Sequence, residues 1–423
     1  MPFDPKLAQY NSSLALSSPR DPRLAFVMLP DFRPDPNSTR IELFASVVAA
    51  QEGRVRSAGS GSGNPLLAGF VFDMFCSALM GTAAEFGVPA YVFSPPNATF
   101  LGFVFHVQKL HDEERVDTTE LPDSVGELAV PCLTRPVPRW ALPDVVADKV
   151  WLPIMLGHTR RIREAKGILV NTFRELESYA LDSMGGDDCI PPIYPVDDVA
   201  YDDDRTNEIF RWLDDQPDSS VVFLCFGTMG TFGEDQVREI AYGLEQSGHR
   251  FLWVLRRPPS DHEPKSNIST DYDDLIDILP EGFSDRTVEA GRVVGWAPQK
   301  AILAHKAIGG FVSHCGWNSI LESLWFAVPI AAWPMYAEQQ LNAFQLVVEL
   351  ELATEMKLSY RMKGENDMIV SASEIERGIR RLMEEGMEKR VKWEEMSEMA
   401  RKTLMVSGSS FSSTGRFVRD FLG

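Results

Sequence analysis

The chain has 423 residues, of which 44% are hydrophobic and 24% charged, so it is too long for one compact core and predicts two or three domains. A formal net charge of −20 argues against binding to nucleic acid or anionic membranes, because such a surface repels phosphate. The sequence contains no apolar run of about 18 residues, so it predicts no membrane span. The first twenty residues lack a secretory signal pattern. Five scattered cysteines without a CxxC pair are typical of reduced thiols in a cytoplasmic protein.

Short apolar strands alternate with amphipathic helices along the chain, which is the pattern of parallel sheets covered by helices. In the first half, the predicted strands are 24–29, 67–72, 90–93 and 168–170. The helices of this half are 77–86, 175–183 and one that runs from a cap at Asn37 or Ser38 to about residue 51. In the second half, we expect strands at 221–225, 251–255, 293–295, 310–313 and 329–332. The helices there are 234–246, 339–350, 373–384 and 389–405.

Two polar stretches separate these elements. Residues 196–218 carry nine acidic side chains and no long apolar run, which indicates a linker. Residues 258–273 predict a polar surface loop. The simplest architecture is an α/β protein with two consecutive doubly wound domains, 1–195 and 219–405, and a ligand cleft between the carboxyl ends of their strands.

Trp296 begins the segment that carries most of the chemistry. It follows a predicted strand at a turn, together with Ala297 and Gln299. An indole at that place offers a flat face on which a nucleobase can stack, a contact worth about 1–3 kcal/mol. The alternative is a tryptophan of the hydrophobic core.

Residues 309–319 read as a strand, a tight glycine turn and the start of a helix. A helix N-terminus presents free N–H groups and the positive end of a dipole, and a pyrophosphate is the natural ligand of that arrangement. His314 adds a donor beside Gly316, and Asn318 and Ser319 are either phosphate ligands or helix caps.

Carboxylates and amides follow at positions that suit hydroxyl groups. Glu322 lies one helical turn after Ser319, where its two oxygens suit the vicinal hydroxyls of a ribose. Trp317, Glu338 and Gln339 offer an aromatic face, a carboxylate and an amide, which is the mixture that carbohydrate sites use. The order and spacing of these residues, more than any one of them, indicate a nucleotide-sugar site.

This segment, WAPQKAILAHKAIGGFVSHCGWNSILESLWFAVPIAAWPMYAEQ, resembles the 44-residue signature of the plant secondary-product glycosyltransferases, family 1 of the UDP-glycosyltransferases. Residues 212–228, 70–75 and 167–177 resemble further family segments, so the resemblance covers nearly the whole chain. It implies a GT-B fold, in which two doubly wound Rossmann-like domains face a cleft and a final helix, 406–423, joins the first domain. Small departures are Ile320 and Ala327, where threonine and glycine are commoner.

The resemblance also implies an activity and its substrates. Members transfer a sugar with inversion from a UDP-sugar, here a co-substrate and not a cofactor, to a hydroxyl of a small lipophilic acceptor. A flavonoid-like phenolic is the expected acceptor, with terpenoid and hormone acceptors as alternatives. Neither a metal nor a membrane span is expected, and the expected oligomeric state is a monomer. Six apolar side chains are candidates to line the acceptor pocket, with core packing as the alternative for most: Met74, Phe75, Phe93, Phe100, Leu101 and Phe103.

Roles of individual residues also follow from the resemblance. Trp296 stacks on uracil, Gln299 contacts the uridine, and Glu322 binds the ribose. His314, Asn318, Ser319 and Thr228 hold the diphosphate, and Trp317, Glu338 and Gln339 contact the sugar. A glutamine at the position of Gln339 accompanies a preference for glucose. Ala297 and Gly316 complete the predicted UDP-sugar-binding set.

Asp73 matches the family's orienting acid, but its partner has no match. In the family a histidine after the first strand takes the proton of the acceptor hydroxyl, and a buried aspartate orients it. Asp73 follows a predicted strand, where a helix cap is its alternative role, and none of the seven histidines follows a first strand. The expectation is an N-terminal domain without the first strand and the histidine loop.

Other classes of protein fit the sequence less well. A UDP-sugar-binding pseudoenzyme, inert in transfer, fits the unmatched histidine. A nicotinamide-dependent oxidoreductase is disfavoured because no GxGxxG motif opens a helix after a strand. A metal enzyme is disfavoured because His305, His314 and Cys315 lack further ligands at zinc-like spacing.

Overall fold

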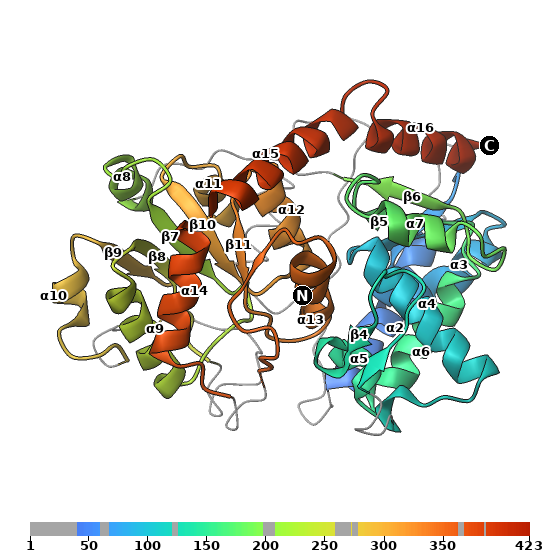
Figure 1. Cartoon of the computed structure of the whole chain (residues 1–423). Helices are drawn as coiled ribbons and strands as arrows, with labels where there is room; N and C mark the ends of the chain where they lie inside the picture. The colour runs from blue at the N-terminus through green and yellow to red at the C-terminus, as the bar shows by residue number, and fades with distance from the viewer. Residues whose placement is uncertain are drawn as a thin grey trace.

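A computed structural model describes residues 40–59, 67–120, 126–197, 208–258, 272, 278–362, 368–384 and 386–423. Two parallel sheets, each covered by helices, lie side by side (Figure 1). The predicted strand 24–29, most of the polar tract 258–273 and part of the predicted linker lie outside the described residues. Helix α8 (Glu208–Asp214) lies within the remainder of that linker.

The first sheet has the order β1 (Phe70–Asp73), β2 (Ala90–Ser94), β5 (Gly167–Asn171) and β6 (Ile193–Val196), all parallel. The strands predicted at 67–72, 90–93 and 168–170 are confirmed within a few residues. Strand β6 was not predicted, because Pro195 interrupts its short apolar run. It lies at the edge of the sheet, which is where a strand tolerates proline.

Helices cover both faces of this sheet, and one of the largest was missed from the sequence. Helix α4 (Ala98–Glu113) is buried over most of its length, so it shows no polar face in its N-terminal half. Asn97 caps it, with its Oδ1 accepting a hydrogen bond from Phe100 N at 2.7 Å. The other helices here are α2 (Arg40–Gly59), α3 (Met80–Glu85), α5 (Asp144–Ala147), α6 (Trp151–Ile162) and α7 (Ser178–Met184). Short elements are 3-10 helices Met74–Leu79, Thr118–Glu120 and Arg139–Ala141, and strands β3 (Glu127–Leu128) and β4 (Val137–Pro138).

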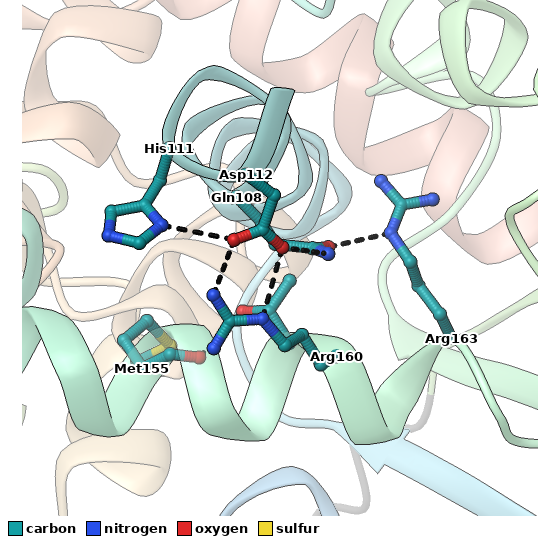
Figure 2. Close-up of polar contacts among 7 residues, drawn as sticks. Gln108, His111, Asp112, Met155, Arg160 and Arg163 are labelled. Carbon is teal, nitrogen blue, oxygen red and sulfur yellow. Dashed lines mark hydrogen bonds and ion pairs between the residues drawn. The ribbon is translucent and has the colours of Figure 1, made fainter. Parts of the chain in front are cut away.

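A polar cluster at the solvent edge joins α4 to α6 (Figure 2). Asp112 accepts hydrogen bonds from Arg160 Nε at 3.0 Å and Gln108 Nε2 at 3.1 Å, and lies 3.0 Å from His111 Nδ1. Gln108 Oε1 in turn accepts a hydrogen bond from Arg163 Nε at 2.7 Å. The guanidinium of Arg160 holds the pKa of Asp112 well below its usual range.

The second sheet has the order β12 (Thr354–Glu355), β11 (Ile330–Ala332), β10 (Ile308–Ser313), β7 (Val221–Cys225), β8 (Arg250–Val254) and β9 (Gly291–Val294). All of its pairs are parallel, and every residue of β7 is buried, as expected for a continuous apolar run in a covered sheet. All five strands predicted for this half are confirmed. The helices are α9 (Glu234–Ser247), α10 (Phe283–Thr287), α11 (Gln299–Leu303), α12 (Trp317–Trp325), α13 (Gln339–Phe344) with a π-helical continuation Gln345–Glu349, α14 (Ala372–Glu384) and α15 (Gly386–Thr403).

The last helix, α16 (Ser409–Leu422), packs against the first sheet (Figure 1). Tyr91 donates a hydrogen bond to the Asp420 carbonyl at 2.9 Å, and Tyr194 donates one to Asp420 Oδ2 at 2.6 Å. The ring of Phe417 meets both tyrosine rings edge-on. Helix α16 therefore packs on the first half of the molecule, although it follows the second sheet in the sequence. Among the described helices none is long and apolar enough to cross a membrane.

Candidate nucleotide-sugar site

Most of the predicted binding residues lie in loops and helix starts that follow the carboxyl ends of the second sheet's strands. Ligands of doubly wound sheets bind at this edge. Trp296 comes two residues after β9, and 57% of its surface is exposed, so it is not a core tryptophan. The neighbouring Ala297 is buried, and Gln299 opens α11. An accessible indole at this edge is what stacking on a base requires.

Gln299, Ser319 and Glu322 form one hydrogen-bonded cluster between α11 and α12. Gln299 Nε2 donates to Ser319 Oγ at 2.9 Å and to Glu322 Oε2 at 2.7 Å. Lys300 Nζ lies 3.9 Å from Glu322 Oε1. Burial raises the pKa of Glu322, and Gln299 and Lys300 oppose that shift. The cluster fixes a carboxylate and an amide beside the first two turns of α12.

The imidazole of His314 fills the space between two glycines. A Cβ on either Gly227 or Gly316 would lie 2.6 Å from His314 Nε2, so neither position has room for a side chain unless the ring moves. Gly227 also has a φ of +73°, which favours glycine. Burial lowers the pKa of His314 to about 4, so the ring is neutral at physiological pH. The three residues bring β7, β10 and α12 together at one point.

Gly316 is the N-cap of α12, and it supplies no side-chain cap. Asn318 is exposed, and its Oδ1 accepts a hydrogen bond from Asn171 Nδ2 at 2.8 Å, whereas Ser319 Oγ accepts from Gln299. Neither side chain therefore serves as the cap that the sequence left as an alternative. The first N–H groups of a nine-residue helix point toward this edge of the sheet.

Trp317 is buried where the two halves of the molecule meet. Only 3% of its surface is exposed, and its Nε1 donates a hydrogen bond to the Asn171 carbonyl at 2.6 Å. The indole thus packs between the two halves of the molecule and presents no open aromatic face.

Glu338 and Gln339 lie where the loop after β11 enters α13. Gln339 is buried, and its Oε1 accepts hydrogen bonds from Met335 N at 3.0 Å and Tyr336 N at 3.1 Å. Burial raises the pKa of Glu338, and the charge of Asp144 raises it further. The glutamine amide therefore orders the loop that carries it. Thr228, on the loop after β7, is exposed.

Asp73 lies at the end of β1 in the first half. Its Oδ1 accepts a hydrogen bond from Phe75 N at 2.9 Å, so the capping role is present, and burial raises its pKa. Within the described residues no histidine is hydrogen-bonded to it. Asp73 caps the 3-10 helix Met74–Leu79, and His158 contacts that helix at Ser77, where His158 Nδ1 and Ser77 Oγ are 2.8 Å apart.

Sequence reasoning missed two features beside this site. Arg256 is buried two residues after the end of β8, and it lies close enough to influence the pKa of Cys225, which burial raises to about 11. A cation straight after an apolar strand was the available signal. A buried polar network also crosses between the halves: Asn97, Thr99, Glu177, Asn342 and Gln345. The network joins residues as much as 248 positions apart, so no local sequence signal marks it.

A family model described as UDP-glucoronosyl and UDP-glucosyl transferase matches residues 191–370. UDP-glycosyltransferase 71A15 from Malus domestica is 52% identical over 415 residues, which cover 94% of this chain and 87% of that protein. Anthocyanidin 3-O-glucosyltransferase 1 from Manihot esculenta is 49% identical over 430 residues, which cover 99% of this chain and 92% of that protein.

Solved structures agree with these relatives. A transferase from Siraitia grosvenorii in complex with UDP has 46% identity and a TM-score of 0.83, with 92% of this chain and 85% of that chain covered. An enzyme from Medicago truncatula complexed with UDP-glucose has 36% identity and the same TM-score of 0.83, with 100% and 89% covered. The predicted GT-B fold is confirmed. The chain therefore belongs to the plant UDP-glycosyltransferases, the enzyme family that its 44-residue segment predicted.

Proposed function

We propose that this enzyme transfers glucose, with inversion, from UDP-glucose to a hydroxyl of a small phenolic acceptor of the flavonoid type. The observation that carries the donor half of the proposal is the fixed Gln299–Ser319–Glu322 cluster beside the exposed Trp296. The acceptor half rests on relatives named as anthocyanidin and flavonoid 3-O-glucosyltransferases. The structure of the Medicago truncatula enzyme with UDP-glucose supports glucose as the sugar.

Uridine is bound by Trp296 together with the Gln299–Ser319–Glu322 cluster. Uracil stacks on Trp296, and Gln299 and Ala297 lie along its edge. Glu322 accepts hydrogen bonds from the two ribose hydroxyls, which bidentate carboxylates suit. Burial of Glu322 strengthens those bonds, because they compete less with water than exposed ones do.

The diphosphate lies at the mouth of α12. Its negative charge meets the free N–H groups that follow Gly316 and the positive end of the helix dipole. His314, neutral at physiological pH, contributes a single N–H donor, and Asn318, Ser319 and Thr228 add amide and hydroxyl groups. These local donors offset the repulsion from a protein of net charge −20. The hexose then extends toward Glu338 and Gln339.

Inversion follows from a single displacement at the anomeric carbon. The acceptor oxygen attacks from the face opposite UDP, its bond to carbon forms as the bond to the phosphate oxygen breaks, and its proton passes to a base. Asp73 is the acid on the acceptor side, and it hydrogen-bonds to Phe75 N and to no histidine in the described residues. That observation favours a second candidate, a UDP-sugar-binding protein with weak transfer, since losing general-base assistance costs about 10²–10⁴-fold in rate.

Calorimetry with UDP and a product assay with UDP-glucose and a flavonol test both candidates. We expect the wild-type chain to bind UDP, and W296A to bind it about 5–150-fold more weakly, the equivalent of about 1–3 kcal/mol of stacking. Y179A, which removes an equally exposed aromatic ring on α7, should bind UDP as the wild type does. Unchanged affinity in W296A would refute the donor site. Binding with turnover reduced about 10²–10⁴-fold from that of a full enzyme would select the second candidate.

A further inference from the structure

Two hydrogen bonds join the halves of the molecule at Ala337, the residue before Glu338 and Gln339, which we propose as contacts to the sugar. Ala337 has a φ of +61°, a left-handed conformation that is unfavourable for residues with a Cβ. Its N–H donates to Asp144 Oδ2 at 3.0 Å, and Asp144 N donates to the Ala337 carbonyl at 3.1 Å. Asp144 begins α5 in the first half, so a residue of one domain holds a strained peptide of the other.

Asp144 is itself held from the second half. Arg361 forms an ion pair with Asp144 Oδ1 through Nη1, and its Nη2 donates to the Leu142 carbonyl at 2.5 Å and the Trp140 carbonyl at 3.0 Å. The next residue, Met362, donates its N–H to the Met335 carbonyl at 2.8 Å. The segments 140–144, 335–337 and 361–362 are thus locked together.

Three successive peptides of the loop are fixed by side-chain oxygens. Gln339 Oε1 accepts from the N–H groups of residues 335 and 336, and Asp144 Oδ2 accepts from that of Ala337. The loop then turns into α13 at Glu338. Because a strained conformation persists only where its surroundings over-determine it, the direction of the Glu338 and Gln339 side chains depends on Asp144.

We propose that Asp144 is a positioning residue for the sugar subsite, holding the Ala337 loop so that Glu338 and Gln339 meet the hexose of the donor. The inference rests on the proposed donor site and deepens it. The uridine contacts at Trp296 and Glu322 lie within the second half and do not involve Asp144. The sugar subsite, in contrast, is complete only when the two domains are docked at this contact.

The test compares UDP with UDP-glucose, using calorimetry on the full chain, and UDP-galactose as a third ligand. In D144A we expect the Kd for UDP to stay within about 2-fold of the wild type, while UDP-glucose binds about 10-fold more weakly and loses its advantage over UDP-galactose. D144N keeps an oxygen for Ala337 N but weakens the ion pair to Arg361, so it should fall between D144A and the wild type.

A second substitution separates loop positioning from a general interface effect. Glycine adopts a positive φ without strain, so adding A337G to D144A should restore part of the UDP-glucose affinity. E245A, which removes the two-point ion pair between Glu245 and Arg286 away from the cleft, is the control and should change none of the three affinities. The proposal is overturned if D144A weakens UDP and UDP-glucose equally, or if UDP-glucose binding and selectivity are unchanged. A wild-type chain that binds neither ligand would instead refute the donor site itself.

Discussion

The two halves of the molecule carry their share of the site in different ways. In the second half, one continuous stretch of sequence supplies helix α11, strand β10, the glycine turn and helix α12, and Gln299 of α11 bonds to two side chains of α12. In the first half, Asp73 is a single acid at a strand end, surrounded by apolar packing. The donor side can therefore be predicted from residues that are close in the sequence. The acceptor side depends on which apolar residues face outward, and the sequence does not show that.

The apolar candidates for the acceptor pocket illustrate the difference. Met74, Phe100, Leu101 and Phe103 are almost fully buried in the core of the first half, so packing accounts for them. Phe75 and Phe93 are only partly buried. A hydrophobic residue has the same sequence signature in a core and in a pocket, and only the fold separates the two.

The largest expected effect comes from substituting one glycine on the donor side. In G316A the new Cβ meets the His314 ring at 2.6 Å, and because Gly316 has a φ of −62° no backbone strain confuses the result. Displacing the ring removes a proposed hydrogen bond to the charged diphosphate, worth about 1.5–3 kcal/mol, so UDP should bind about 10–150-fold more weakly. Uridine, which lacks the diphosphate, should bind nearly as it does to the wild type. Calorimetry with both ligands measures the difference.

A glycine with open space around it provides the control. A Cβ added to Gly157 in α6 would meet no neighbouring side chain closer than 3.9 Å, so G157A should leave both affinities unchanged and slightly stabilise the helix. Equal weakening of UDP and uridine in G316A would show that the residue does not act through the diphosphate.

A smaller effect tests how the two halves are joined. Asn342 is fully buried, donates to the Cys315 carbonyl at 3.0 Å and accepts from Asn97 Nδ2 at 3.1 Å. N342L leaves that carbonyl unpaired, which costs about 1–3 kcal/mol, so the urea midpoint should fall. Q108L removes bonds at the solvent edge of α4, where water replaces them, and should change the midpoint far less (Figure 2). Equal midpoints for the two variants would contradict the expectation.

These same contacts mark where sequence reasoning ends. The apolar run of β7 and the order of residues 314–322 are local signals, and they predicted a buried strand and a phosphate-binding turn. The contact between Arg361 and Asp144 joins residues 217 apart, and that between Asn342 and Asn97 joins residues 245 apart. Each of these residues alone resembles an ordinary polar surface position. Only the docking of the two domains gives them partners, so no local pattern could have identified them.

The smallest expected effect concerns a histidine of the first half. His158 is buried against Ser77 and the edge of the Phe75 ring, and burial, with a smaller influence of Arg161, lowers its pKa to about 4. An unfolded histidine titrates near 6.5, so between pH 6.5 and 4 the unfolded chain binds more protons than the folded one. The stabilisation from the neutral ring is therefore complete above pH 6.5 and is lost as the pH falls toward 4.

Urea midpoints measured across this pH range check the assignment. H158N keeps a hydrogen-bonding partner for Ser77 but cannot titrate, so its midpoint should fall less steeply with decreasing pH than that of the wild type. Some slope should remain, because His314 also has a pKa of about 4 and loses its neutral form in the same window. Curves that stay parallel would mean that protonation of His158 is not coupled to unfolding. A flatter curve with unchanged UDP affinity would assign His158 to the packing of the first half and not to the donor site.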